Sequence, residues 1–161
     1  MDPISHAIIG GALSLVNGGE ISANNPFLIA SMLGAVSPDF DIVYRLKGEV
    51  KYLREHRGFS HSIPGLVILS AGICAVLSLI YPAAALQELF LWAFVGAFSH
   101  TFFDYLNSYG VELFGPLSKR KFTLNLLQIA DPIILILMGL SFVFAHFNVD
   151  AHILYVCESI S

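Results

Sequence analysis

An uncharged apolar run over residues 63–81 restricts the fold of this chain more than any other feature. Pro64 opens the run and Pro82 closes it, and its length is about that needed for a helix to cross roughly 30 Å of hydrocarbon. Apolar residues make up 56% of the 161 residues and charged residues only 12%, which is about half the charged share of a soluble domain. A chain this short cannot bury so much apolar surface in a core of its own. We therefore predict an all-α membrane protein with a single domain that covers residues 1–161.

Other apolar segments indicate further helices. One covers about residues 89–106, and another covers residues 132–147, where Asp131 is placed to cap the helix before a proline at its first position. Upstream, residues 4–16 and 27–36 form two segments that are too short to cross comfortably as straight helices. They could form thin or tilted spans, or a re-entrant hairpin. We expect a polytopic protein with three clear transmembrane helices and these two short N-terminal helices.

The basic residues predict the orientation in the membrane. All eight fall in two loops, and they are Arg45, Lys47, Lys51, Arg54 and Arg57 in the first loop and Lys119, Arg120 and Lys121 in the second. Two crossings separate these loops, so both lie on the same side, which the positive-inside rule assigns to the cytoplasm. The start of the chain has no basic region before its first apolar segment, so we expect no cleavable signal peptide.

Three short polar bursts interrupt the apolar sequence. They are residues 38–41 (Pro-Asp-Phe-Asp), 56–62 (His-Arg-Gly-Phe-Ser-His-Ser) and 99–104 (Ser-His-Thr-Phe-Phe-Asp). Ionisable groups beside a bilayer are costly, and they persist mainly where they pair, bind an ion or line a pathway. By the parity of the crossings, all three bursts lie on the cytoplasmic side, whereas His146 and His152 fall near the opposite side. The sequence therefore predicts a metal site at the cytoplasmic face.

His100 and Asp104 form the simplest pair of candidate ligands. Their spacing of four places both side chains on one face of a helix, and imidazole with carboxylate suits zinc or manganese. The alternative is a buried histidine that hydrogen-bonds a neighbouring aspartate. Two ionisable groups within an apolar run favour the ligand interpretation.

His56 and His61 do not share a face of a helix, because five residues turn well past one full circle. Gly58 favours a loop or a helix start, and a loop can bring both imidazoles inward. The alternative is a solvated basic loop in which His56 lies at the surface. Ser60 and Ser62 are placed to cap the helix that begins near residue 63.

Four other ionisable residues have two interpretations each. Asp39 and Asp41 follow one another closely, as in two-metal sites that use carboxylates to hold ions about 3.5–4 Å apart, or they cap the next segment. His6 lies four residues after Asp2 and is either a ligand or a structural histidine. Arg57 either clamps a phosphate or carboxylate, or anchors its loop to anionic lipid.

Taken in order, these motifs resemble a bacterial family of inner-membrane metal-dependent hydrolases, some of which are named for regulation by the LexA repressor. The resemblance covers about residues 1–135, and the block His-Arg-Gly-Phe-Ser-His-Ser is its most specific part. It implies an inner-membrane protein whose family polar positions are His6, Asp39, Asp41, His56, His61, His100 and Asp104. A weaker likeness exists to the all-helical zinc-dependent phospholipases C, whose ligands include a His-x3-Asp pair on a helix. Many members of the family continue beyond the length of this chain.

We expect a membrane-bound hydrolase that uses one or two divalent ions, zinc or manganese, on a lipid or other amphiphilic phosphoester. The first-choice ligands are His61, His100, Asp104 and Asp39. A second ion, or a general base, would draw on His56, Asp41 and His6. The residues with expected catalytic roles are His56, Asp41 and Arg57, the last of which would hold the phosphate. Membrane lipids are the expected partners, and we expect no nucleic acid.

Two other functions fit the same residues. An ion or metal transporter, or a proton relay, also places histidine and aspartate within a membrane, although transporter sites usually lie near the midplane. A non-catalytic lipid-binding protein could carry the same residues as a structural ion site with no open coordination position. The oligomeric state is left open by the sequence.

Overall fold

The structure is a computed structural model that describes residues 2–17, 20–48, 57–107, 110–118 and 120–126, together with Ile136 and Leu140. Within these residues the α-helices are α1 (Pro3–Ser14), α2 (Pro26–Val36), α4 (Ile63–Ile80) and α5 (Leu86–Leu106). Three segments of 3₁₀-helix are η1 (Leu15–Asn17), η2 (Ser37–Lys47) and η3 (Phe59–His61). Extended pairing in the described part of the chain is an isolated bridge between Val111 and Phe122. The all-α prediction is therefore confirmed.

Three of the four helices begin at a side-chain cap. Asp2, Asn25 and Ser62 each accept a hydrogen bond from a backbone N–H in the first turn of α1, α2 and α4, and a proline follows in each first turn. Such caps satisfy backbone donors that have no partner within the helix. The expected cap at Ser62 is confirmed, whereas Ser60 makes other contacts. The fourth helix, α5, begins after Ala85 without a side-chain cap.

Within the described residues, three helical segments are long and apolar enough to cross a membrane: Pro26–Val43, Ile63–Ile80 and Leu86–Leu106. The second and third confirm predicted spans, and the third begins three residues earlier than expected. The first segment is longer than expected. Residues 27–36 alone were too short to cross comfortably, but η2 continues α2 and extends the helical segment to Val43. The predicted span over residues 132–147 lies outside the described residues, as does its expected cap.

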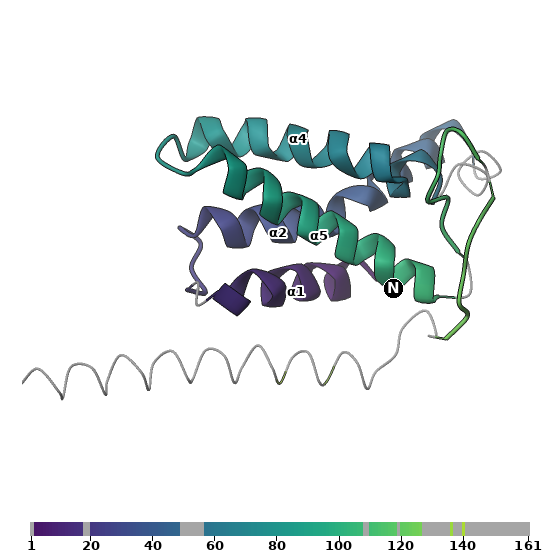
Figure 1. Ribbon diagram of the computed structural model, residues 1–161, viewed down its shortest axis with the longest axis horizontal. Coiled ribbons are helices and arrows are strands. Elements are labelled where there is room, and N and C mark those ends of the chain that lie inside the picture. Colours follow the sequence, from purple (N-terminus) through teal and green to yellow (C-terminus); the bar gives the residue numbers. More distant parts are fainter. Residues whose placement is uncertain are drawn as a thin grey trace, which may run out of the picture.

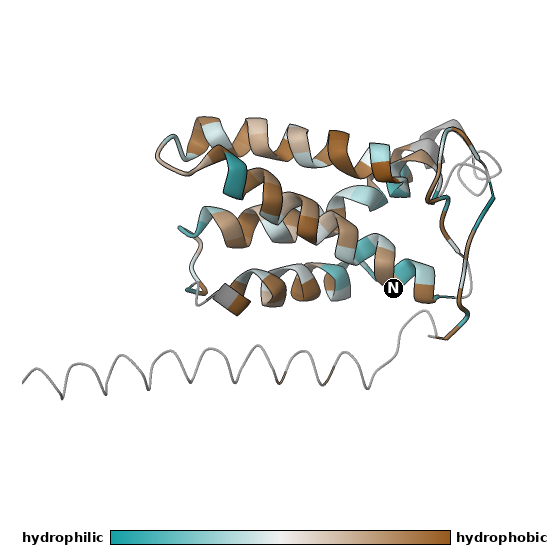
Figure 2. Ribbon diagram, viewed as in Figure 1, coloured by the Kyte–Doolittle hydropathy of each residue, from teal (hydrophilic) through white to brown (hydrophobic). Residues whose placement is uncertain are grey.

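The helices pack side by side, with α2 and α5 in contact at the centre, α1 against α2, and α4 against α5 (Figure 1). Apolar residues cover most of their length, and polar residues concentrate where α5 ends (Figure 2). The turn between α4 and α5 marks what we call the far end of the bundle. Its buried core consists of Ala30, Leu77, Leu89 and Ala93. The opposite end, where α4 begins and α5 ends, is the site end.

Close contacts through small residues fix how α1, α2 and α5 meet. A Cβ at Gly96 of α5 would lie 2.0 Å from the carbonyl oxygen of Ser31 on α2. A Cβ at Gly10 of α1 would lie 2.7 Å from the same oxygen and 2.6 Å from Ala35 Cβ. Small residues at such positions let helix backbones approach closely within a membrane. The two glycines therefore allow α1 and α5 to pack closely against the same short stretch of α2, around Ser31 and Ala35.

A loop closes the site end. We call residues 110–118 and 120–126 the end loop; it follows α5 and lies beside the start of α4 (Figure 1). Ile63 N donates to the Leu113 carbonyl at 3.2 Å, and Leu124 N donates to the Tyr105 carbonyl at 3.0 Å. The end loop is thus tied both to the start of α4 and to the last turn of α5.

Candidate metal centre

Five candidate ligands come together at the site end, although they come from four elements. His6 lies on α1, Asp39 on η2, His61 at the end of η3, and His100 and Asp104 on α5. All except Asp39 are fully buried, whereas the Asp39 side chain is 21% exposed. His6, His100 and Asp104 form one group whose ligand atoms lie within 4.8 Å of one another, and Asp39, His61 and His100 form another.

The imidazole of His100 is oriented by a backbone carbonyl. Its Nδ1 lies 2.6 Å from the carbonyl oxygen of Ala35 on α2. A carbonyl can only accept, so Nδ1 carries a proton, and in the neutral ring Nε2 then presents a lone pair. Histidines that bind metals are commonly held in this way by a carbonyl or carboxylate on the other nitrogen. The close approach at Gly96, one turn earlier on α5, brings His100 within reach of this carbonyl.

The imidazole of His61 is oriented by a chain of side chains. Its Nδ1 lies 3.0 Å from Ser60 Oγ, and Ser60 Oγ in turn donates to Asp41 Oδ2 at 3.4 Å. Because the Ser60 hydroxyl gives its proton to the carboxylate, it can accept the proton on His61 Nδ1. In the tautomer with the proton on Nδ1, Nε2 of His61 presents a lone pair as well.

The two Nε2 lone pairs face each other. Nε2 of His61 and Nε2 of His100 lie 3.1 Å apart, and lone pairs at this distance repel unless a cation lies beside both. Asp104 Oδ2 lies 3.6 Å from each of these nitrogens. Asp39 Oδ1 lies 3.5 Å from His100 Nε2 and 4.0 Å from His61 Nε2. Ligand atoms around a tetrahedral zinc, bonded at 2.0–2.1 Å, are separated by about 3.3 Å.

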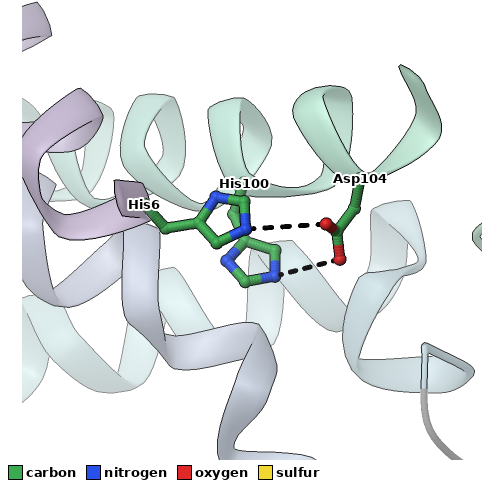
Figure 3. A group of neighbouring side chains, drawn as sticks. All are labelled: His6, His100 and Asp104. Carbon is green, nitrogen blue, oxygen red and sulfur yellow. Dashed lines mark ion pairs between the residues drawn. The ribbon is translucent and has the colours of Figure 1, made fainter. Parts of the chain in front are cut away.

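His6 adds a third imidazole beside the four residues just described. Its ring stacks on that of His100, with centroids 3.7 Å apart and an interplanar angle of 25°. Its Nε2 lies 3.5 Å from Asp104 Oδ1, on the carboxylate oxygen that does not face the other two histidines (Figure 3). Within the described part of the chain, neither ring nitrogen of His6 has a hydrogen-bond partner. Buried polar atoms of this kind are rare in proteins and are consistent with a ligand role.

Burial keeps two of these imidazoles neutral. It lowers the pKa of His6 to about 4, and it lowers the pKa of His61 as well, because a buried imidazolium loses its hydration. Neutral imidazole is the form that binds metal ions. Both side chains are thus ready to act as ligands at neutral pH.

Arg57 contacts the same carboxylate from another side. Its Nε lies 3.0 Å from Asp104 Oδ2 and its Nη2 donates to Oδ1 at 3.1 Å. Arg57 itself is 7% exposed and has a positive φ of 61°, which is unusual for a residue other than glycine. Asp41 Oδ2 accepts from Arg57 N at 2.9 Å, and the Arg57 carbonyl accepts from Glu112 N at 3.1 Å. The arginine is therefore held at both its backbone and its side chain.

The structure brings together most of the residues that the sequence analysis singled out. Asp39, His61, His100, Asp104 and His6 converge, whereas His56 lies outside the described residues. Asp41 lies nearby, 3.9 Å from His61 Nδ1, on the side away from the facing Nε2 atoms. Asp2 caps α1, where its side chain accepts from Ser5 N.

Some residues that shape the site were not expected from the sequence. The Ala35 carbonyl carries no sequence signal, because it is a backbone group. Gly10 and Gly96 do carry a signal, since each lies four residues from a candidate histidine and so shares its helix face. Ser60 was expected to cap α4, but it contacts His61 and Asp41 instead.

The fold and the site together define a helical membrane protein with a buried His/Asp cluster at one end of its bundle. The model of the YdjM inner membrane protein family matches residues 1–159, so the chain belongs to this family. Membership and the three candidate spans place the protein in the inner membrane.

A similar curated protein is the uncharacterized protein YfhP of Bacillus subtilis (strain 168). The two are 37% identical over 142 residues, which cover 84% of this chain and 43% of the relative. The chain thus spans less than half the length of this relative. No solved structure matches the chain.

Proposed function

We propose that this protein is a membrane-bound hydrolase that uses a divalent metal ion held by His61, His100, Asp39 and Asp104. The observation that carries the proposal is the pair of facing Nε2 atoms 3.1 Å apart, with two carboxylates within 3.5–4.0 Å of them. A set of two imidazoles and two carboxylates suits zinc, and it also suits manganese.

A bound ion of this kind would lower the pKa of a bound water towards about 7 and polarise a scissile phosphoester. The residues of the chain supply the geometry. The Ala35 carbonyl and the Ser60 hydroxyl hold His100 and His61 with Nε2 pointing inward, and Arg57 holds Asp104. Because these contacts are already formed, little reorganisation is needed when the ion binds.

Access to the centre favours an amphiphilic substrate. Asp39 is the most exposed of the five candidate ligands, so a reactant would enter on its side. The residues that follow it on η2 include exposed apolar side chains, and Phe59 of η3 is exposed as well. These are Phe40, Ile42, Val43 and Phe59. The basic loop residues and the positive-inside rule support a site at the cytoplasmic interface, where a phospholipid or another lipid-linked phosphoester would meet it.

The test begins with metal content. Detergent-purified wild-type protein is reconstituted with zinc or manganese, and the bound metal is counted by elemental mass spectrometry beside His61→Ala and His100→Ala. We expect bound metal in the wild type and its loss in both variants. His146→Ala is the matched control, because the sequence places this histidine near the opposite side of the membrane. The same preparations are then assayed for hydrolysis of phospholipid and water-soluble phosphoesters.

Three results would overturn the proposal. The first is a wild-type protein that binds no metal after reconstitution, which is expected if His61 and His100 share a proton instead. Metal content and hydrolysis that are unchanged in His100→Ala would remove the site. Metal uptake into proteoliposomes that depends on Asp104, without hydrolysis, would identify a transporter instead.

A further inference from the structure

Arg57 and the expected ion share one carboxylate. Oδ2 of Asp104 faces the Nε2 atoms of both His61 and His100 at 3.6 Å, while the guanidinium of Arg57 contacts both oxygens at 3.0 and 3.1 Å. In two-metal hydrolytic sites, a carboxylate often stands between two ions about 3.5–4 Å apart. Here a fixed guanidinium lies on the second side of that carboxylate.

We propose that the centre holds a single divalent ion and that the guanidinium of Arg57 takes the place of a second ion. This inference rests on the metal site proposed above and decides its stoichiometry. It also gives Arg57 a defined role, because a permanently charged, planar donor group beside the ion suits the oxygens of a phosphoester.

The charges of the described residues fit one ion. Asp39, Asp41 and Asp104 bring three carboxyl groups to the site end, and the guanidinium of Arg57 brings one permanent positive charge. One divalent ion and Arg57 supply three positive charges in return. A second divalent ion would leave two positive charges uncompensated in a site that is almost wholly buried, which is strongly unfavourable.

The backbone around Arg57 is built to keep the guanidinium in this position. Its positive φ is maintained by two hydrogen bonds, one to the carboxylate of Asp41 and one from Glu112 of the end loop. Strained backbone of this kind persists only where the surroundings fix it, and it is concentrated at functional sites. Asp41 therefore acts as a positioning residue that holds both the backbone of Arg57 and, through Ser60, the ring of His61.

Among the residues that the structure describes, the further group of candidate ligands lies on the side that Arg57 occupies. His6 Nε2 and Asp104 Oδ1 lie 3.5 Å apart, and Oδ1 accepts from Arg57 Nη2 at 3.1 Å. Removal of the guanidinium charge should therefore open this position to a second ion, whose binding would depend on His6.

The experiment counts metal ions in the full chain. Purified protein in detergent is titrated with Zn²⁺ and, separately, with Mn²⁺ by calorimetry, and the bound metal is counted by elemental mass spectrometry. We expect one equivalent in the wild type, one in Arg57→Lys, two in Arg57→Gln, and one again in the double variant Arg57→Gln, His6→Ala. Arg120→Gln is the matched control, because in the described part of the chain Arg120 lies over the Phe122 ring of the end loop; it should bind one equivalent.

The outcomes separate this inference from the proposed function. Two equivalents in the wild type would overturn the inference and leave the hydrolase proposal intact, and so would a single equivalent of unchanged affinity in Arg57→Gln. No metal in the wild type would overturn both. Thermal unfolding followed by circular dichroism shows whether Arg57→Gln is folded; if it is not, the counts in the wild type and Arg57→Lys decide the question.

Discussion

At the far end of the bundle, helices meet through apolar side chains such as Leu77 and Leu89. At the site end, the same helices meet through imidazoles, carboxylates and the guanidinium of Arg57. An apolar side chain needs no specific hydrogen-bond or charge partner, and an apolar core tolerates substitutions that conserve its volume. A buried polar cluster, in contrast, stabilises a fold only when every group is satisfied. Burial of the polar groups at the site end thus costs free energy, whereas the far end shows that apolar packing alone can hold these helices together.

This difference indicates what the two ends are for. Replacing buried charge pairs by apolar residues is often neutral or stabilising, so a cluster of this size is retained for a reason other than stability. The far end supplies packing, and the site end uses the rigidity gained there to hold the candidate ligand atoms in place. Variants at the two ends should therefore separate metal binding from stability.

The largest effect on metal binding is expected from Gly96→Leu. The new Cβ would lie 2.0 Å from the Ser31 carbonyl oxygen, so α2 and α5 must move apart, at a cost of at least about 1–3 kcal/mol. Both the metal and the cooperative unfolding transition should be lost, as measured by elemental mass spectrometry and circular dichroism. Gly72→Leu on α4 is the matched control, because a Cβ there has nothing within 4 Å. Similar behaviour of the two variants would contradict the close-packed interface.

The second effect compares two carboxylates. Asp104→Asn and Asp39→Asn should both weaken metal binding, but only Asp104→Asn leaves the buried guanidinium of Arg57 without its carboxylate. That change should destabilise the metal-free protein by about 3–5 kcal/mol. Asp39 is partly exposed, and its substitution should cost less than about 1 kcal/mol. Thermal unfolding in detergent with a chelator present measures both, and equal losses would refute the assigned pairing.

A smaller effect is expected from Ser60→Ala. The hydroxyl orients His61 and connects it to Asp41, and loss of such outer contacts typically weakens metal binding about 10–100-fold. Calorimetric titration with Zn²⁺ measures the change. Ser78→Ala is the control, since that hydroxyl donates to the Ala75 carbonyl within α4. An unchanged affinity in Ser60→Ala would mean that His61 is oriented by other contacts.

The smallest effect on metal binding is expected from Leu77→Ala at the far end. The cavity should lower the free energy of unfolding by about 2 kcal/mol, while the metal count stays that of the wild type. Loss of metal in a folded Leu77→Ala protein would show that the two ends are coupled.

The candidate site could be predicted largely from the sequence, because its ligands follow local spacing and the parity of crossings. His100 and Asp104 share a helix face at any packing angle, and His61 must lie beside them if α4 and α5 are antiparallel neighbours. For Asp39 to meet these residues, α2 needs only to end on the same side of the membrane as α5.

The other features of the site depend on the backbone conformation, which the spacing of residues in the sequence does not predict. The contact between Arg57 and Asp104 requires a positive φ at Arg57, and that φ requires the Asp41 carboxylate and the end loop. The length of the first span was also underestimated. The two aspartates interrupt the apolar pattern after residue 36, although the chain remains helical through η2.

The position of His6 on the first helix has a consequence for how the protein is made. During synthesis this imidazole emerges almost one hundred residues before Asp104, the carboxylate it faces. Until the last turn of α5 has entered the membrane and folded back beside α1, the two donors cannot meet. If the centre binds an ion as proposed, ion binding reports that α5 has been inserted: a nascent chain halted within α5 would lack Asp104 and therefore a complete set of candidate ligands.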